Sequence, residues 1–497
     1  MSSIGPFGGA GFSSSQSMAE LREQINDLSR QLSTGKRAAT ISQSGNALSR
    51  SIDLRARLSR LSIYDEAIAS ASTDLNTISN SINSFSTVSS RALFETLSVA
   101  TTADPSNRST VKTNLRRQFS ELIDYLNIDS NGSYLFGGKN TMSPPVLDAN
   151  MILDGTSGKA GLTQYIAERQ AADLGADNQG RLQLSNSTNE VSLAETVSGS
   201  VFGFTLRGIT SNDPGIVATA PSGTPPQLSL SVNAQPAPNS VVTLTLGLPD
   251  GTTTEITLTA AGDSASNGFA IGETVDDTAS NLTTALRSAL VSTGKTQLFS
   301  ASAKAAAGDF FKGSTTNPPH RVNGPSFETA TAFTAGSADD TVIWYQGTDD
   351  TNDPRNDRIS KIDERLSIGL GVRANEPGFV EALTGAALLA VTNFSTSDET
   401  LAKKQFTDLR GRARDSLSQS KTDVTTTNVS LLTAQKSAKS RSDDQKAQKT
   451  VFETALVTIE DAPLDQTAVS LTSLQTQLQA LYQLTAKLQS MSLANYL

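Results

Sequence analysis

Apolar side chains recur every seven residues over several consecutive repeats in the N-terminal part of the chain. A heptad repeat of this kind predicts a long helix whose apolar seam packs against other helices. The pattern runs from about residue 47 to residue 100, roughly 80 Å of helix at 1.5 Å per residue, and such a helix is unstable unless its seam is covered. Two sets of residues form the seam: Leu61, Ile68, Leu75 and Ile82, and Tyr64, Ala71, Ile78 and Phe85.

Shorter apolar stripes at helical spacing lie near both ends of the chain. The N-terminal stripe stops at Gly35, which can adopt the left-handed conformation that ends a helix. A lone striped helix does not offset its own ordering entropy, so each stripe predicts a surface that another helix covers. That helix belongs either to the same chain or to a neighbouring molecule, and the position at the ends favours assembly. The candidate assembly interface is Met18, Leu21, Ile25, Leu28, Leu32, Leu471, Leu474, Leu478, Leu481, Leu488, Tyr496 and Leu497.

Two further helices are predicted between these elements. One begins near Arg108, after the break at Asp104-Pro105, and ends before the turn at Asn131-Gly132. The other runs from about residue 402 to residue 459, and Pro463 separates it from the C-terminal stripe. The apolar residues expected in their cores are Val111, Leu115, Phe119, Leu122, Ile123, Leu126, Phe406, Leu409, Ala413, Leu417, Val424, Leu431 and Leu432.

The middle of the chain has a different composition. From about residue 144 to residue 345 Gly, Pro, Thr, Val and Asn are frequent, and alternation replaces the helical period. Residues 241–248 and 255–258 read as a β-hairpin that turns at Asp250-Gly251, and a single helix is expected around residues 276–289. Residues 221–226 and 315–320 read as connecting loops.

These patterns predict a multidomain fold: a long α-helical bundle or coiled coil formed by the N- and C-terminal segments, with an inserted β-rich (α+β) middle region. We divide the chain into three parts. Residues 1–40 with 463–497 form a terminal helical assembly domain, residues 41–150 with 376–462 a helical bundle domain, and residues 151–375 the inserted outer domain or domains.

Composition argues against most enzyme classes. The 497 residues include no cysteine and one histidine, His320, so thiolate chemistry and histidine-based zinc sites are excluded. The formal net charge of −9 disfavours nonspecific binding to nucleic acid. No apolar stretch of membrane-spanning length occurs, and the first residues lack a signal-peptide pattern. We therefore expect no catalytic site, no cofactor and no metal site, and a protein that is cytoplasmic or exported without a cleaved leader.

Three features of the middle region have a functional interpretation and a simpler one. His320 follows two prolines and is expected in a solvated loop rather than in a metal site. The acidic segment 349–357 has oxygen ligands suited to Ca²⁺ but lacks the order of an EF-hand, so a solvated turn is favoured. Trp344 could stack on a sugar, but its alternation with Val342 favours the core of a small strand. Ser and Thr hydroxyls in this region could accept glycans, which the sequence does not decide.

Several motifs at both ends of the chain resemble one known family. Residues 31–37 (QLSTGKR) resemble the loop after the first helix of flagellins and their relatives. Residues 54–61 (LRARLSRL), 132–138 (GSYLFGG) with Pro144-Pro145, 342–347 (VIWYQG), 371–376 (GVRANE), 478–488 and 492–497 (SLANYL) are similar to the hook-associated protein 3 branch of the flagellin superfamily. The resemblance covers about residues 17–145 and 340–497 and hardly touches the middle.

The resemblance implies a structural protein of the bacterial flagellum that joins the hook to the filament. Its implied partners are other flagellar axial proteins, namely the first hook-associated protein and flagellin, further copies of itself in a ring at the junction, and a type III export chaperone. It implies export through the flagellar type III system and an extracellular position on the flagellum, with no nucleic acid and no membrane as partners. One departure is residues 38–44 (AATISQS), where the family usually carries acidic residues.

Two alternatives stay open. The first is a filament-forming flagellin, against which residues 132–138 and the C-terminal SLANYL sequence argue. The second is a hydrolase that uses carboxylates alone, built on the β-rich insertion, although no pair of acids stands out. Copy number on the flagellum separates the junction protein from the filament protein, and incubation with glycans or peptides tests for an enzyme.

Overall fold

The structure is a computed structural model that describes residues 9–38, 45–98, 104–261 and 268–494. It divides into two compact units, and two long helices, α2 (Gly45–Ser98) and α9 (Glu399–Glu460), each contribute to both. Unit 1 comprises residues 1–70, 361–367 and 437–497, and unit 2 comprises residues 71–360 and 368–436. These boundaries differ from the three predicted domains, which stay a prediction.

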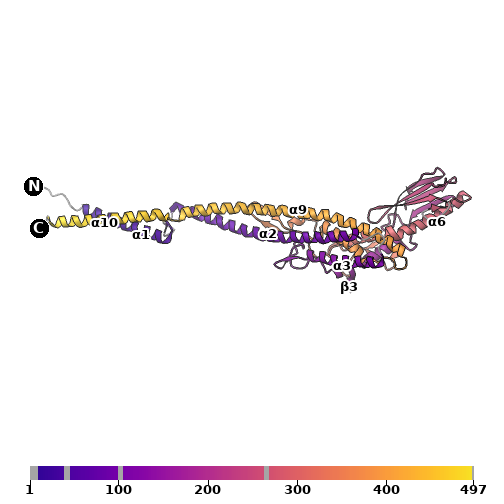
Figure 1. Cartoon of the computed structure of the whole chain (residues 1–497), viewed down its shortest axis with the longest axis horizontal. Coiled ribbons are helices and arrows are strands. Elements are labelled where there is room, and N and C mark those ends of the chain that lie inside the picture. The colour runs from indigo at the N-terminus through magenta and orange to yellow at the C-terminus, as the bar shows by residue number, and fades with distance from the viewer. Residues whose placement is uncertain (1–8, 39–44, 99–103, 262–267, 495–497) are drawn as a thin grey trace. The chain divides into compact units, whose positions relative to one another are not determined.

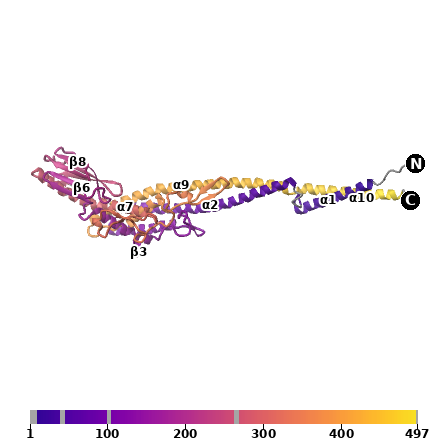
Figure 2. The ribbon, with the colours of Figure 1, turned by 180° about the vertical axis from the view of Figure 1, so that it is seen from behind.

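Unit 1 consists of helices from both ends of the chain. Helix α1 (Gly9–Thr34) lies along α10 (Leu464–Ala494), as Figures 1 and 2 show from opposite sides. Helix α1 ends where the sequence predicts, because Gly35 adopts a φ of 71° and its amide donates to the carbonyl of Gln31 at 2.8 Å. Pro463 separates α9 from α10, also as predicted.

Unit 2 contains the helical bundle that buries most of the heptad seam. Helix α3 (Pro105–Leu126) begins at an Asp104 N-cap and packs against α8 (Pro377–Val391). The predicted seam residues of α2 from Ala71 to Phe85 are at most 2% exposed, and Phe85 meets the ring of Phe379 edge-on at 5.1 Å. Helix α8 approaches α9 closely at Gly378, whose carbonyl accepts a hydrogen bond from Ser420 at 2.7 Å. A side chain at Gly378 would collide with the backbone of α9.

The predicted core residues of α3 and α9 are buried with one exception. Leu432 is 37% exposed, so its assignment to the core is wrong. Leu431 next to it is 1% exposed and takes the inward position. Adjacent residues of a helix point about 100° apart, so one of two neighbouring leucines has to face solvent at the edge of a narrow seam.

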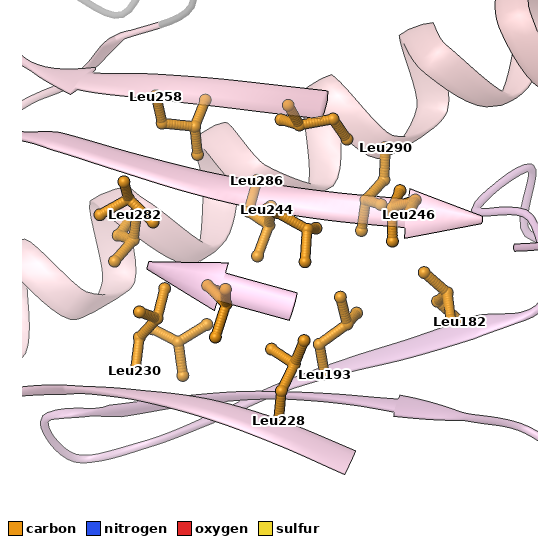
Figure 3. Packing of buried hydrophobic residues seen from close by; sticks show 14 of the residues in the cluster. Leu182, Leu193, Leu228, Leu230, Leu244, Leu246, Leu258, Leu282, Leu286 and Leu290 are labelled. Carbon is orange, nitrogen blue, oxygen red and sulfur yellow. The ribbon is translucent and has the colours of Figure 1, made fainter. Parts of the chain in front are cut away.

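The inserted region contains two four-stranded sheets and helix α6 (Val275–Thr293) around one core (Figure 3). The predicted hairpin is confirmed, because β10 pairs antiparallel with β11 around Asp250-Gly251. Arg412 of α9 forms an ion pair with Asp250 in the hairpin loop, with a 2.8 Å Nε–Oδ2 distance, which holds the hairpin against the bundle. The strands of the first sheet lie in the order β5 (Leu182–Ser187), β6 (Glu190–Glu195), β9 (Gln227–Val232) and β8 (Ile216–Ser222). The strands of the second sheet lie in the order β12 (Gly268–Phe269), β11 (Thr253–Ala260), β10 (Val241–Gly247) and β7 (Thr205–Ser211).

Short elements connect these larger parts. They are β1 (Asp129–Ser130), β2 (Ser133–Tyr134), α4 (Ala149–Asp154), β3 (Gly155–Thr156), β4 (Lys159–Ala160), α5 (Leu162–Leu174), η2 (Gly294–Leu298), α7 (Phe299–Lys312), β13 (Arg321–Val322), η3 (Phe327–Thr329), β14 (Phe333–Thr334), η4 (Pro354–Asn356), β15 (Ile359–Lys361) and β16 (Ser367–Gly369). The predicted fold class is thereby confirmed: long terminal helices with an inserted α+β region.

Three expectations for the middle region are wrong. The insertion contains α5 and α7 as well as α6; α7 follows α6 through η2, which begins at Gly294, a residue typical of a helix end. Pro221 and Ser222 belong to β8 rather than to a loop, which an edge strand permits because its outer amides need no partner. Trp344 is buried as expected but lies outside any strand, and its Nε1 donates to the carbonyl of Phe311 at 2.9 Å.

Helix α7 supplies core to the bundle, which the sequence analysis did not anticipate. The ring of Phe311 lies 6.2 Å from Phe119 of α3 and 5.4 Å from Trp344. All three side chains are at most 1% exposed. The insertion therefore contributes packing to the bundle in addition to forming an outer domain.

We predict that Phe311→Ala lowers the free energy of unfolding of unit 2 by about 3–5 kcal/mol, because it leaves a cavity between α3, α7 and Trp344. Urea unfolding followed by far-UV circular dichroism measures the change, and fluorescence of the single Trp344 reports on the same contact. Phe94→Ala is the matched control, since Phe94 is 68% exposed, and its effect is expected to stay within about 0.5 kcal/mol. Equal effects of the two substitutions would contradict a core role for α7.

Candidate assembly surface

The two predicted stripes face one another in unit 1, yet they stay partly open. Met18, Leu21, Ile25 and Leu28 of α1 are half-buried, and Leu32 is 39% exposed. The stripe of α10 is half-buried at Leu471, Leu474, Leu478 and Leu481. The side chain of Leu488 and the residues Tyr496 and Leu497 lie outside the described part of the structure. Two helices cover one side of each other's stripe, whereas the bundle surrounds the α2 seam from Ala71 to Phe85 and buries it.

A polar contact links the outer edges of the helix pair. Arg22 of α1 donates from Nε to the hydroxyl of Tyr482 of α10 at 2.8 Å, and its guanidinium lies 5.5 Å from the centre of the tyrosine ring. Tyr482 is 40% exposed, so the contact is open to solvent. Sequence reasoning missed this pair, because neither residue belongs to an apolar stripe and no local pattern connects residues this far apart.

At the base of the pair, the turn after α1 is hydrogen-bonded to the turn after α9. The amide of Arg37 donates to the carbonyl of Glu460 at 2.9 Å, and the amide of Ala462 donates to the carbonyl of Gly35 at 2.9 Å. Lys36 and Asp461 form an antiparallel bridge, and their side chains form an ion pair. These bonds hold the C-terminal end of α1 next to the N-terminal end of α10.

The carboxylate of Glu460 is at the centre of this base. It accepts two hydrogen bonds from Arg55 of α2, at 2.9 and 2.7 Å, and one from the hydroxyl of Ser51. Lys36 lies 3.7 Å away. The hydrogen bonds from Arg55 and Ser51 lower the pKa of Glu460 from 4.5 to about 2. Because the folded pKa is depressed, this group stabilises the fold above about pH 4.5, and that stabilisation is lost as the pH falls toward 2.

Helix α10 has few charges for an exposed helix. Between Asp465 and Lys487 it contains only uncharged residues, mostly Leu, Gln, Thr, Ser and Ala. On the faces that point away from α1 it exposes Val469, at 71%, and Leu484, at 55%. Helix α1 carries Glu20, Glu23, Asp27 and other charges over a similar length. A long exposed helix with apolar residues and few charges is typical of a surface that is covered by protein.

Three of the resembling motifs meet in unit 2. The amide of Gly138 donates to Val372 at 3.2 Å, and the amide of Ala374 donates to Phe136 at 2.9 Å. The amide of Thr348 donates to Gly137 at 3.0 Å. Residues 132–138, 342–347 with the adjacent Thr348, and 371–376 thus form the place where the chain leaves the bundle and returns to it. Gly138, with a φ of 66°, also lies too close to Asp357 and Thr348 to accommodate a side chain.

The acidic segment 349–357 lies at this meeting point and forms ion pairs. Arg373, only 3% exposed, binds Asp350 and Asp357, and Lys139 binds Asp350 at 2.7 Å. Hydrogen bonds from Lys139 and Arg373 hold the pKa of Asp350 well below its usual value. The expectation of a solvated turn is therefore wrong for Asp357, whose side chain is 1% exposed, whereas Asp350 is ion-paired but exposed. In the described parts of the chain no group of three or more His, Asp or Glu side chains is arranged to hold a metal ion.

His320 lies in an exposed loop, and its backbone carbonyl accepts a hydrogen bond from Tyr165 at 2.6 Å. Its ring borders a cavity of about 10 Å³ together with Tyr165, Asp309 and Phe333. That volume is near the minimum that holds one water molecule, so a substrate does not fit there.

The sequence of the N-terminal helices matches a known family model. Residues 11–141 match the bacterial flagellin N-terminal helical region. The match spans nearly all of α1, together with α2, α3 and the β1–β2 turn. A comparison of the chain with characterised proteins finds no significant match. Among the described helices, none is both long and apolar enough to cross a membrane.

We predict that backbone amides of α1 and α10 exchange with deuterium on the order of tenfold faster than those of residues 71–92 in the monomeric protein. The half-open stripes make local opening of the helix pair less costly than opening of the bundle. Hydrogen exchange followed by mass spectrometry at neutral pH measures both regions in one experiment. Equal protection would show that the pair is stable on its own and needs no further cover.

Proposed function

We propose that the chain is a structural adaptor that joins the hook of the bacterial flagellum to the flagellin filament, through coiled-coil packing of its terminal helices. The observation that carries the proposal is the half-open pair of stripes on α1 and α10. Because the two stripes lie together in one helix pair, helices of neighbouring molecules can cover the faces that the pair leaves open. The match of residues 11–141 to flagellin supports the axial structure as the place of this contact.

The assembly interface comprises the predicted residues of the two stripes. In the assembled structure, neighbouring helices cover the faces of Leu471, Leu474, Leu478 and Leu481 that the pair leaves open. The uncharged surface of α10 supports this role, because it loses little hydration energy on burial compared with a charged helix. The charged residues of α1 favour a more polar environment for that helix.

The partners follow from this position. They are the first hook-associated protein on the hook side, flagellin on the filament side, and further copies of the chain in a ring. Export through the flagellar type III system, without a cleaved leader and with the help of a chaperone, brings the chain to this extracellular site. The ion-paired meeting point of residues 132–138 and 371–376 supports the junction branch, because these motifs resemble it and pack together.

A filament-forming flagellin is the second candidate function. The match to the flagellin N-terminal helical region favours it equally, since that region is common to both kinds of protein. Fluorescent labelling of a cysteine introduced at an exposed outer position, such as Thr257, separates the two in living cells. A single spot at the base of each filament supports the adaptor, and label along the whole filament supports the flagellin.

We predict that Leu478→Asp abolishes filament attachment while the protein is still made and exported. A carboxylate buried without a partner in an enclosed seam costs several kcal/mol, whereas the half-open stripe of the monomer leaves it in contact with water. Cells carrying the variant are expected to grow hooks without filaments and to release flagellin into the medium, as electron microscopy and immunoblots of the medium show.

The matched control is Leu478→Met, which preserves volume and apolar character and is expected to support normal filaments. Thermal unfolding of the purified Leu478→Asp monomer is the second control. An unchanged melting midpoint of the bundle supports the assembly role. Normal filaments on the Asp variant, or a large loss of monomer stability, would contradict it.

A further inference from the structure

The base of the helix pair contains an arrangement that helix chemistry disfavours locally. Helix α9 ends in Glu460, followed directly by Asp461, and its last turn has no basic residue. The C-terminus of a helix carries a partial negative charge, so acids there are unfavourable unless cations from elsewhere neutralise them. A local feature that destabilises its own helix indicates that the site has another role.

The neutralising groups all come from the N-terminal half of the chain. Arg55 and Ser51 of α2 bind the Glu460 carboxylate, and Lys36 binds Asp461. Arg37 donates from Nε to the carbonyl of Asp461 at 2.8 Å, so it also satisfies the end of the helix. Arg30 of α1 then donates to the carbonyl of Arg37 at 3.1 Å. One chain of contacts thus runs from α1 through the turn to α2 and α9.

Two backbone hydrogen bonds complete the connection, from Arg37 to Glu460 and from Ala462 to Gly35. They cross between turns that are more than four hundred residues apart in sequence. The first turn, with Gly35, Lys36 and Arg37, has no large apolar side chain, and the second turn buries only the small side chain of Ala462. Polar contacts therefore hold the two turns together, and the charges of the side chains determine whether these contacts form.

We propose that the side chain of Glu460 with Arg55, Ser51 and Lys36 forms a charge-operated latch, which couples the α1–α10 pair to the α2–α9 pair and releases it when the Glu460 charge is lost or screened. With the latch closed, the acids at the end of α9 are neutralised and the stripes of α1 and α10 start in register. With the latch open, the acids at the end of α9 are no longer neutralised, and the α1–α10 pair is free to change direction. The latch is a property of the single chain and does not depend on the axial assembly it joins.

The charged groups around Glu460 determine the sign of the effect. Lys36, Arg37 and Arg55 carry positive charge, and Asp461 is the only nearby acid among the described contacts of the latch. Replacing Glu460 by Gln increases the excess of cations and leaves one oxygen, in place of two, to accept hydrogen bonds from Arg55. Salt screens the exposed members, since the Arg55 side chain is 61% exposed, so salt and the Glu460→Gln substitution act in the same direction.

Hydrogen exchange of the full chain tests the latch at the two amides that close it. In Glu460→Gln the amides of Arg37 and Ala462 are expected to exchange on the order of tenfold faster than in the wild type, while residues 71–92 keep their protection. Raising the salt concentration is expected to accelerate these amides in the wild type and to have little effect in the variant. Unchanged exchange at Arg37 and Ala462 in the variant would overturn the proposal.

Two further variants separate a latch from a general loss of charge. Glu453→Gln changes an exposed glutamate of the same helix, and it is expected to leave both amides unchanged. Arg55→Gln is expected to reproduce the effect of Glu460→Gln, and the double variant is expected to add little to either. Additive effects of the two substitutions, or an equal response in Glu453→Gln, would show that the residues act independently and that no latch exists.

Discussion

The buried seam of α2 is the constraint on which the rest of the structure depends. A helix of 54 residues cannot persist in water unless its apolar side is covered, and α3, α8 and α9 cover most of it. This requirement brings together segments from the two halves of the chain. The insertion has to leave the bundle after α3 and return before α8, and the ion pairs around Arg373 hold the two crossing segments at that point.

The same physical principle gives a different outcome at the ends of the chain. The α1–α10 pair has no third helix among the described residues of unit 1 along its length, so its stripes stay half-buried. The core side chains of the bundle are buried, whereas those of the two stripes are only half-buried. This difference supports a role in assembly. The polar contacts around Glu460 connect these two kinds of packing, because they join the α1–α10 pair to α2 and α9, which are held by apolar packing.

The helices were largely predictable because their signals are local. Heptad spacing located α2, Gly35 located the end of α1, and Asp104-Pro105 located the start of α3. The places where prediction failed share a different cause. The Phe311 side chain of α7 became core through contact with Phe119 and Trp344, which are distant from it in sequence. The carboxylate of Asp357 looked solvated because its partners, Lys139 and Arg373, are distant in sequence. The candidate stripes were found, whereas Arg22, Tyr482 and Glu460 were not.

The sequence by itself determined where helices form and end, which side of each is apolar, and that both ends need a cover, since these depend on the spacing of neighbouring residues. It also determined the hairpin at Asp250-Gly251 through its turn chemistry. Only the tertiary structure decided which helix covers which stripe, how completely, and which charges meet. Those outcomes depend on distances between residues such as Arg55 and Glu460, which the chain brings together only when its two halves fold onto each other.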